Sequence, residues 1–361
     1  MEKKAGMTNR ERVEALLNRE KPDRVPLWPC FGGIGFAVVY TGTTISDAYN
    51  KPEVSLAAQR KTAQDFGWVF VPQLGYAAMG GWEFGGEIKW PSGEWSQAPS
   101  VIRHAVETEE DAWNLKMPDV KNAGIVPIMT EFYKLSSQEM LDNEPFNVYS
   151  TASAPFTLAG NICGAEVLAK WLIKKPKAAH HLLRMATDYT IELAQYYRDI
   201  FGIEGVLPLG AEPTSANDIV SPKQFEEFVF PYLKENNEKV LSMGYKHIWF
   251  HICGEHNLNL PYWAQVPMGD PGIISIGHEI ELETAAKYFP NDIILGNLEP
   301  AIIQVRTPEE VYEATKKNIQ DGMTKCPQGY MFSPGCELPP MASVDNVMAM
   351  TKAVNDVGWY D

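Results

Sequence analysis

The chain has 361 residues, of which 45% are hydrophobic and 21% charged, and both fractions are ordinary for a globular protein with a full core. Its formal net charge of -15 argues against a nucleic-acid surface, which needs basic patches, and favours solubility. No apolar run approaches the ~20 residues of a membrane span and the N-terminus has no apolar signal core, so we expect a cytoplasmic protein without a membrane partner.

Short apolar runs that are typical of buried strands recur along the chain. We expect strands at eight places, namely 25–31, 68–74, 147–154, 205–210, 246–255, 273–277, 293–296 and 330–333. Helical patterns separate these runs. We expect them at 53–66, 126–140, 164–201 (split at Pro176), 221–241, 281–288, 343–357 and from Thr307 onward. Thr8 and Glu11 form a capping box for a further helix at the N-terminus.

Eight strands that alternate with helices predict a (β/α)8 barrel of the TIM type, which we place in a single domain over residues 1–361. The N-terminal helix precedes the first strand. Segment 84–98, which contains the turn sequence Pro-Ser-Gly, is expected to form a hairpin inserted in a loop. In such barrels the active site lies where strands end and βα loops begin, so polar residues that follow strands are the first candidates.

The segment KHIWFHICGE, residues 246–255, holds the most informative pattern. Side chains two residues apart share one face of a strand, so His251 and Cys253 point the same way where the fifth strand ends. An imidazole and a thiolate together prefer zinc. The pair alone is weak evidence, because this spacing arises by chance and a buried cysteine commonly behaves as a small hydrophobic residue.

Two more donor residues follow other predicted strands. Cys336, in SPGCELPP, follows the eighth strand, and Glu279 follows the sixth. A closed barrel brings the fifth and eighth strands to the same mouth, so all these side chains would face one rim. We therefore predict a catalytic zinc site of His251, Cys253 and Cys336. Glu279 is an optional fourth ligand.

Other titratable residues are weaker candidates. The five scattered cysteines do not form a secreted disulfide framework, and we interpret Cys163 as a core residue. His256 and His278 flank the proposed ligands, and each is an alternative donor. Glu212 follows the fourth strand and is predicted either to act as an acid, base or hydrogen-bond partner, or to cap a helix and orient ligands.

An open zinc position has two uses. It can hold a substrate thiol as a thiolate, which is a strong nucleophile at neutral pH, or it can act as a Lewis acid on a substrate oxygen. The sulfur-rich ligand set favours the first use.

The segments RVPLW, APFTLAG, ISIG, GNLEP and SPGCELPP, in this order, resemble the uroporphyrinogen decarboxylase superfamily over about residues 9–356. Within it, the HxC pair and the distant SPGC cysteine are similar to the zinc-dependent corrinoid methyltransferases, which include methylcobamide:coenzyme M methyltransferases. The resemblance implies Zn2+ as cofactor and a methyl group that passes between a corrinoid such as methylcobalamin and a small acceptor, for example the thiol of coenzyme M. It also implies a separate corrinoid protein as partner, and it is compatible with a homodimer.

The chain departs from the decarboxylases themselves where they grip a porphyrinogen. By this resemblance Gln73 replaces their essential aspartate, Asn161 a tyrosine and Cys336 a histidine, and the first-strand loop lacks their arginines. A substrate with eight carboxylates would meet no counter-charge here, so we set porphyrinogen decarboxylation aside. The predicted substrate-binding residues are Gln73, Asn161, Glu212 and Asn297.

Two further alternatives stay open. The protein could instead remove methyl groups from a methoxylated or methylamine-like donor. It could also be a barrel without catalytic activity, in which zinc only joins the fifth and eighth strands while the mouth binds a corrinoid partner.

Overall fold

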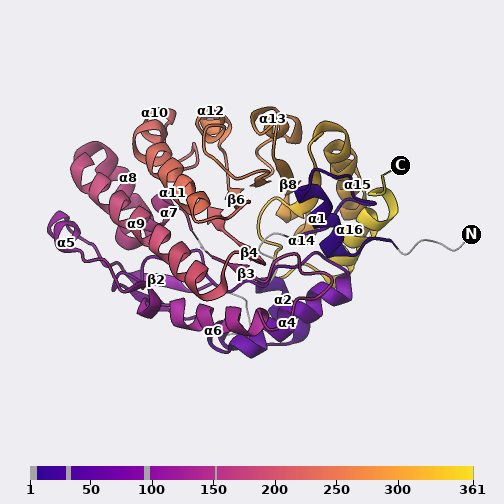
Figure 1. Cartoon of the computed structure of the whole chain (residues 1–361), viewed down its shortest axis with the longest axis horizontal. Helices are drawn as coiled ribbons and strands as arrows, with labels where there is room; N and C mark the ends of the chain where they lie inside the picture. The colour runs from indigo at the N-terminus through magenta and orange to yellow at the C-terminus, as the bar shows by residue number, and fades with distance from the viewer. Residues whose placement is uncertain (1–5, 30–33, 93–97, 151–152, 361) are drawn as a thin grey trace, which may run out of the picture.

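Short parallel strands occupy the middle of the molecule and helices surround them (Figure 1). The computed structural model describes residues 6–29, 34–92, 98–150 and 153–360. The strands in these ranges are β1 (Glu87–Lys89), β2 (Ser100–Arg103), β3 (Val148–Tyr149), β4 (Val206–Leu207), β5 (Leu209–Ala211), β6 (Trp249–Ile252), β7 (Ile273–Ile276), β8 (Ile293–Leu298) and β9 (Tyr330–Pro334). Five of them form one parallel sheet in the order β5-β6-β7-β8-β9, and β3 pairs with β4 in parallel.

Extended segments continue this sheet beyond β9. Leu27 forms a parallel bridge to Phe332 of β9, and the backbone N–H of Val69 donates to the Leu27 carbonyl over 2.8 Å. The backbone N–H of Ala154, beyond β3, donates in turn to the Ala211 carbonyl of β5. The predicted strand positions thus follow one another in chain order, as expected of the (β/α)8 barrel of the TIM type.

The first two predicted strands are wrong as regular strands. Described residues of 25–31 contribute only the isolated bridge at Leu27, and 68–74 contains no strand residue. Prolines explain the difference, because Pro26, Pro29 and Pro72 have no N–H with which to continue a ladder. These apolar runs are still buried, as predicted from their composition.

The helices follow the strands around the barrel in chain order, as the colour sequence in Figure 1 shows. The α-helices are α1 (Asn9–Leu17), α2 (Gly35–Thr41), α3 (Ile45–Asn50), α4 (Pro52–Phe66), α5 (Glu109–Asn114), α6 (Val126–Ser136), α7 (Pro155–Cys163), α8 (Ala165–Lys174), α9 (Pro176–Phe201), α10 (Pro222–Gln224), α11 (Phe230–Ser242), α12 (Leu260–Trp263), α13 (Leu282–Tyr288), α14 (Pro300–Val305), α15 (Pro308–Lys325) and α16 (Val344–Val357). Three further helical turns are η1 (Val120–Asn122), η2 (Phe225–Val229) and η3 (Asn257–Asn259).

Helix starts are the best-predicted local feature. Thr8 and Glu11 form the expected capping box, in which the Thr8 N–H donates to the Glu11 carboxylate over 2.7 Å. The hydroxyls of Ser221 and Thr307 likewise accept from the backbone N–H groups of Gln224 and Glu310. Each of these caps satisfies a donor that has no partner within its own helix.

The predicted helix 221–241 is interrupted. It divides into α10, the π-type turn η2 and α11, which begins at Phe230. Pro231 lies in the first turn of α11 and has no N–H to donate to residue 227, so the regular hydrogen-bond ladder breaks here.

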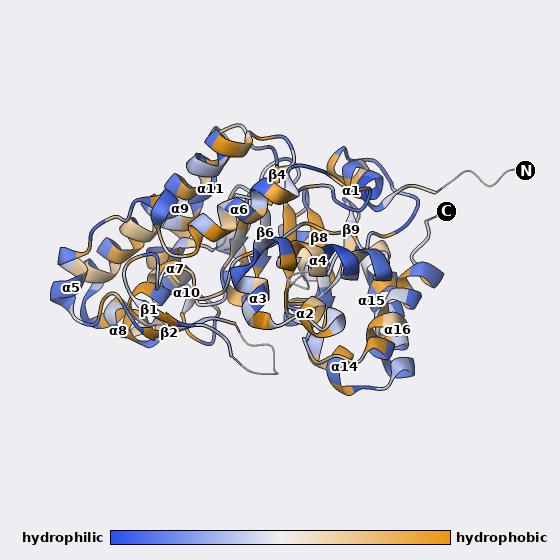
Figure 2. Ribbon diagram, turned by 90° about the horizontal axis from the view of Figure 1, so that it is seen from below, coloured by the Kyte–Doolittle hydropathy of each residue, from blue (hydrophilic) through white to orange (hydrophobic). Residues whose placement is uncertain are grey.

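The predicted insertion forms an antiparallel pair, β1 with β2. The pair begins at Glu87 and ends at Arg103, whereas the hairpin was expected over 84–98, so it extends five residues further along the chain than predicted. Its tip, 93–97, lies outside the described residues. Figure 2 shows this pair at the edge of the molecule, near α8.

Buried side chains from strands and helices form one continuous hydrophobic core. The outer helices carry hydrophilic and hydrophobic residues side by side, as Figure 2 shows for α9 and α15, and they bury their apolar sides. Within the described residues no single helix is long and apolar enough to cross a membrane. One sharply bent pair, α7 with α8, reaches that length and composition only when both helices are joined.

Candidate functional site

Three soft donor atoms meet at one end of the sheet. β6 supplies His251 and is followed directly by Cys253, while Cys336 lies in the loop after β9. One ligand atom from each residue lies within 4.8 Å of the others, and the two sulfurs are 3.8 Å apart. The structure thus brings together residues 83 positions apart in the sequence.

The sulfur separation fits a metal ion and excludes a disulfide in this state. Sulfurs in a disulfide lie ~2.05 Å apart, and both cysteines are free thiols. Two thiolates bound tetrahedrally at ~2.3 Å from zinc lie roughly 3.8 Å from each other, which matches the observed distance between Cys253 and Cys336. Two thiols and an imidazole are also the donor set that zinc prefers.

The neighbouring strand orients the imidazole. Ser275 of β7 lies opposite His251 in the parallel register, and its hydroxyl is 2.9 Å from the imidazole Nδ1. This contact fixes the ring plane so that Nε2 is the nitrogen suited to a metal.

We therefore expect Ser275→Ala to weaken zinc binding by about 10- to 100-fold, because the ligand ring loses its outer hydrogen bond. Competition with a chromophoric zinc chelator measures this affinity. Ser242→Ala, at an exposed position on α11, is the matched control and should leave the affinity unchanged. Equal affinities for both variants would show that Ser275 does not orient the ligand.

The cluster favours a thiolate at Cys336. A hydrogen bond from Cys253 and the nearby His251 outweigh the opposing effect of burial and lower the pKa of Cys336 to about 4. Burial alone raises the pKa values of Cys163 and Cys326 to about 12. Among these three thiols, only Cys336 is therefore a nucleophile near neutral pH.

This difference predicts selective alkylation of the metal-free protein. At pH 6 an ordinary thiol is less than about 1% ionised, whereas Cys336 remains a thiolate. We expect iodoacetamide to modify Cys336 ahead of Cys163 and Cys326, at a rate that changes little between pH 6 and pH 8, as measured by peptide mass. Zinc should protect Cys336. A tenfold loss of rate for each unit of falling pH would contradict the lowered pKa.

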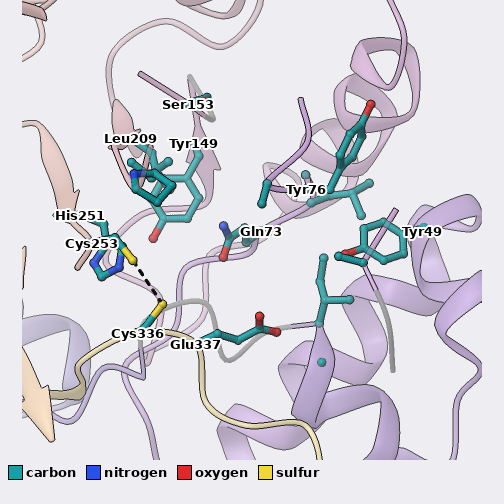
Figure 3. Close-up of a pocket in the computed structure, with 18 of the residues that line it drawn as sticks. Tyr49, Gln73, Tyr76, Tyr149, Ser153, Leu209, His251, Cys253, Cys336 and Glu337 are labelled. Atoms are coloured by element: carbon teal, nitrogen blue, oxygen red, sulfur yellow. Dashed lines mark hydrogen bonds between the residues drawn. The ribbon is translucent and has the colours of Figure 1, made fainter. Parts of the chain in front are cut away.

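The donors open onto a cavity of about 390 Å³. Apolar and aromatic side chains form most of its wall. Polar groups on the wall include those of Gln73, Tyr149, Ser153 and Glu337, which Figure 3 shows around the sulfur pair. Such a cavity has the size and composition of a site for a small organic molecule.

Glu337 is the carboxylate of this cavity. The residue is exposed because its side chain opens onto the cavity, yet neighbouring protein atoms lie close around the carboxylate and partly desolvate it. This desolvation, with a smaller contribution from the negative charge of Cys336, raises the pKa of Glu337 to about 7. The side chain can therefore exchange a proton near neutral pH.

Comparison with known proteins identifies the family of the chain. The family described as Uroporphyrinogen decarboxylase (URO-D) matches residues 8–357. The chain belongs to this family. The resemblance seen in the sequence is thereby confirmed.

Relatives within the family carry two kinds of name. The methylcobamide:CoM methyltransferase MtbA of Methanosarcina acetivorans is 28% identical over 76% of this chain and 75% of its own length. A uroporphyrinogen decarboxylase of Anaeromyxobacter sp. is 24% identical over 72% of this chain and 71% of its own. A solved methyltransferase from Methanosarcina mazei superposes with a TM-score of 0.79 at 20% identity, over 97% of this chain and 99% of that one, and supports the fold.

Of the four predicted substrate-binding residues, only Gln73 lines the cavity, while Asn161, Glu212 and Asn297 do not. Gln73 lines the cavity, and its backbone is held by the Gln59 side chain. The Asn161 amide donates to the carbonyls of Ala77 and Met79, over 2.8 Å each. Asn161 thus holds the loop beside the cavity and does not face the cavity itself.

Asn297 and Glu212 also have structural partners. The Asn297 amide donates to the Ile280 carbonyl over 2.7 Å and so fixes the loop after β7. Glu212 is fully buried and accepts hydrogen bonds from the hydroxyl and the backbone N–H of Thr157, in the first turn of α7. Burial raises the pKa of Glu212 to about 7, although these hydrogen bonds oppose the shift.

The optional ligands do not join the cluster. Glu279 is absent from the group of converging donors among the described residues, and its carboxylate lies 3.5 Å from the His278 ring. His256 is buried, with Nε2 3.2 Å from the Glu212 carbonyl while Trp263 donates to its Nδ1. Burial lowers the pKa of His256 to about 4, so it acts as a neutral structural residue.

Sequence reasoning missed several cavity residues. Tyr49 comes from α3, far from any predicted strand end, and no local pattern marks it, whereas Tyr76 lies two residues beyond the predicted strand 68–74. Tyr149 ends β3, and Glu337 directly follows the proposed ligand Cys336. The rule that residues after strand ends form the site could have identified Tyr76 and Glu337.

Proposed function

We propose that this protein is a zinc-dependent methyltransferase that moves a methyl group between a corrinoid and a small acceptor, with a thiol as the favoured acceptor class. The observation that carries the proposal is that His251, Cys253 and Cys336 converge on the wall of a cavity of small-molecule size. The names of the methylcobamide:CoM methyltransferases among the relatives support the corrinoid.

Zinc, when bound, would supply a positive charge that holds a substrate sulfur as a thiolate at neutral pH. Cys253, Cys336 and His251 would hold the ion, and Ser275 keeps the imidazole in place. The apolar wall excludes water from the nucleophile. In the proposed transfer the thiol loses its proton to solvent, a new S–C bond forms and the cobalt–carbon bond breaks, with the bonding electron pair staying on cobalt.

The corrinoid is proposed to come from outside, on a separate protein or as free methylcobalamin. A cavity of about 390 Å³ lies at the low end for drug-sized ligands, and a corrinoid macrocycle is far larger. The ring would therefore rest at the mouth, with its methyl group directed inward. A cavity beside the ligands also favours catalysis over a purely structural ion, since a structural site is closed by four protein ligands.

Porphyrinogen decarboxylation is the less favoured candidate. The relatives include enzymes named for it, but no Lys or Arg lines the cavity among its described residues. A substrate with many carboxylates would lose its hydration there without gaining a counter-charge.

The test is transfer from methylcobalamin to small thiols by the purified, zinc-loaded protein, followed by the absorbance of methylcobalamin and by mass detection of the thioether. We expect transfer that disappears when a chelator removes zinc and returns when zinc is restored. Demethylation of methoxylated compounds in the presence of a reduced corrinoid would favour the alternative in which the protein removes methyl groups from such donors. Decarboxylation of uroporphyrinogen with no methyl transfer would overturn the proposal.

A further inference from the structure

The charge of the cavity wall beside the sulfur pair determines which ligands it can bind. None of its described lining residues is Lys or Arg. The internal segments outside the described ranges, 30–33, 93–97 and 151–152, contain neither residue type in their sequences. An anionic group of a ligand would therefore find no counter-charge in the wall.

The wall carries a negative charge of its own, the carboxylate of Glu337, which would repel an anionic ligand. Glu337 lines the cavity, and its carboxylate forms no ion pair with any described residue. A side chain at position 35 would displace it, because an added Cβ on Gly35 would lie 2.7 Å from Glu337 Oε1 and 2.8 Å from Pro340 Cγ. Glycine at this position therefore leaves room for the carboxylate at the cavity wall.

Aromatic rings surround the same space. Tyr49, Tyr76 and Tyr149 all line the cavity with Glu337, as Figure 3 shows. Tyrosine faces and a carboxylate are the groups that bind organic cations in proteins. The wall thus has the composition of a site for a small ammonium group.

From this combination we propose that the small methyl acceptor carries a positive charge at the end away from its sulfur, as an aminothiol does. The inference rests on the proposed function and specifies its substrate class. Two cysteine thiolates neutralise a zinc ion, so a bound substrate thiolate and Glu337 leave the site with excess negative charge. An ammonium reduces this excess, whereas a sulfonate such as that of coenzyme M increases it.

Three thiols of similar size separate these cases. Cysteamine carries an ammonium, 2-mercaptoethanol is neutral and 2-mercaptoethanesulfonate carries a sulfonate. Binding is measured at pH 8 on cobalt(II)-substituted protein, where a thiolate that enters the metal shell changes the charge-transfer absorption. We expect cysteamine to bind about 10- to 100-fold more tightly than the neutral thiol, the range for a charge-assisted contact. The sulfonate should bind weakest.

Variants of Glu337 separate cavity recognition from intrinsic thiol reactivity. Glu337→Gln should remove the preference for cysteamine over 2-mercaptoethanol, and Glu337→Arg should shift the preference towards the sulfonate. Comparing each variant with wild type for the same thiol cancels differences in thiol pKa. Glu238→Gln, at an exposed position on α11, is the control and should keep the wild-type order.

The outcomes distinguish the two proposals. Tightest binding of the sulfonate or of the neutral thiol by the wild-type protein would overturn the cationic substrate but leave zinc-dependent methyl transfer intact. An order that does not change in Glu337→Gln would also overturn it. Absence of any thiol-dependent change in the cobalt spectrum, together with no transfer from methylcobalamin, would instead reject the proposed function.

Discussion

Replacing Cys336 by alanine is expected to release zinc and to lower methyl transfer from methylcobalamin by at least about 10³-fold. The substitution removes one of only two thiolate donors in the described cluster and leaves His251 and Cys253 as an incomplete ligand set. Loss of a metal that stabilises a nucleophile costs several kcal/mol of transition-state free energy, and ~1.4 kcal/mol corresponds to a factor of ten. Metal analysis after dialysis and initial rates measure the two effects.

The matched control is Cys326→Ala. Cys326 is a buried thiol of the same chain but lies away from the cluster, with its sulfur 3.9 Å from the Leu282 carbonyl. This variant should keep its zinc and its rate, with only a modest loss of stability from the small void. Full zinc content in Cys336→Ala would show that the metal, if bound, lies elsewhere.

Glu212→Ala is expected to lower the free energy of unfolding by about 3 kcal/mol, the largest stability effect among the candidate site residues. Ala154 precedes α7 and has no side-chain oxygen to cap it, and Glu212 supplies that acceptor from β5's C-terminal loop. Removal leaves the Thr157 N–H and hydroxyl buried with one partner fewer. Urea unfolding, monitored by circular dichroism, measures the change.

This variant also separates the two predicted roles of Glu212. A substrate-binding residue would change KM or binding while leaving the unfolding midpoint near that of wild type. If Glu212 is a helix cap, its loss would lower the urea concentration at the unfolding midpoint. At urea concentrations where the variant is still folded, its zinc affinity would be almost unchanged. Glu238→Ala on the surface of α11 gives the background effect of losing an exposed carboxylate.

Local features of the fold follow from local sequence patterns. The capping boxes at Thr8, Ser221 and Thr307 depend on residues three apart, and the structure contains all three. The apolar runs of β6 to β9 form regular strands, because their N–H groups are free to pair. Prolines in the predicted strands 25–31 and 68–74 remove N–H groups and so prevent regular strands. The apolar composition of these segments did not reveal this effect.

The convergence of the three donor side chains could be predicted, because strand geometry determines it. The spacing of His251 and Cys253 places both on one strand end, and barrel order brings Cys336 to them. Asn161 lies in α7 and Asn297 in β8, and both donate their amide N–H groups to nearby backbone carbonyls. Which polar side chains face the cavity and which hold loops is decided by tertiary hydrogen bonds, which one sequence does not display.

The charge of the cavity is likewise a tertiary property. The overall charge of -15 indicates nothing about this wall, because most charged residues lie on the surface. Only after the chain has folded do Tyr49, Tyr76 and Glu337 surround one space.

X-ray absorption at the zinc edge, with and without an added thiol, tests the central claim most directly. We predict two sulfur neighbours and at least one nitrogen in the resting protein, with a third sulfur at ~2.3 Å once the thiol is present. A shell without sulfur would contradict the assigned ligands. A shell of four protein donors that the thiol leaves unchanged would contradict thiol activation and favour an ion that only joins the two loops.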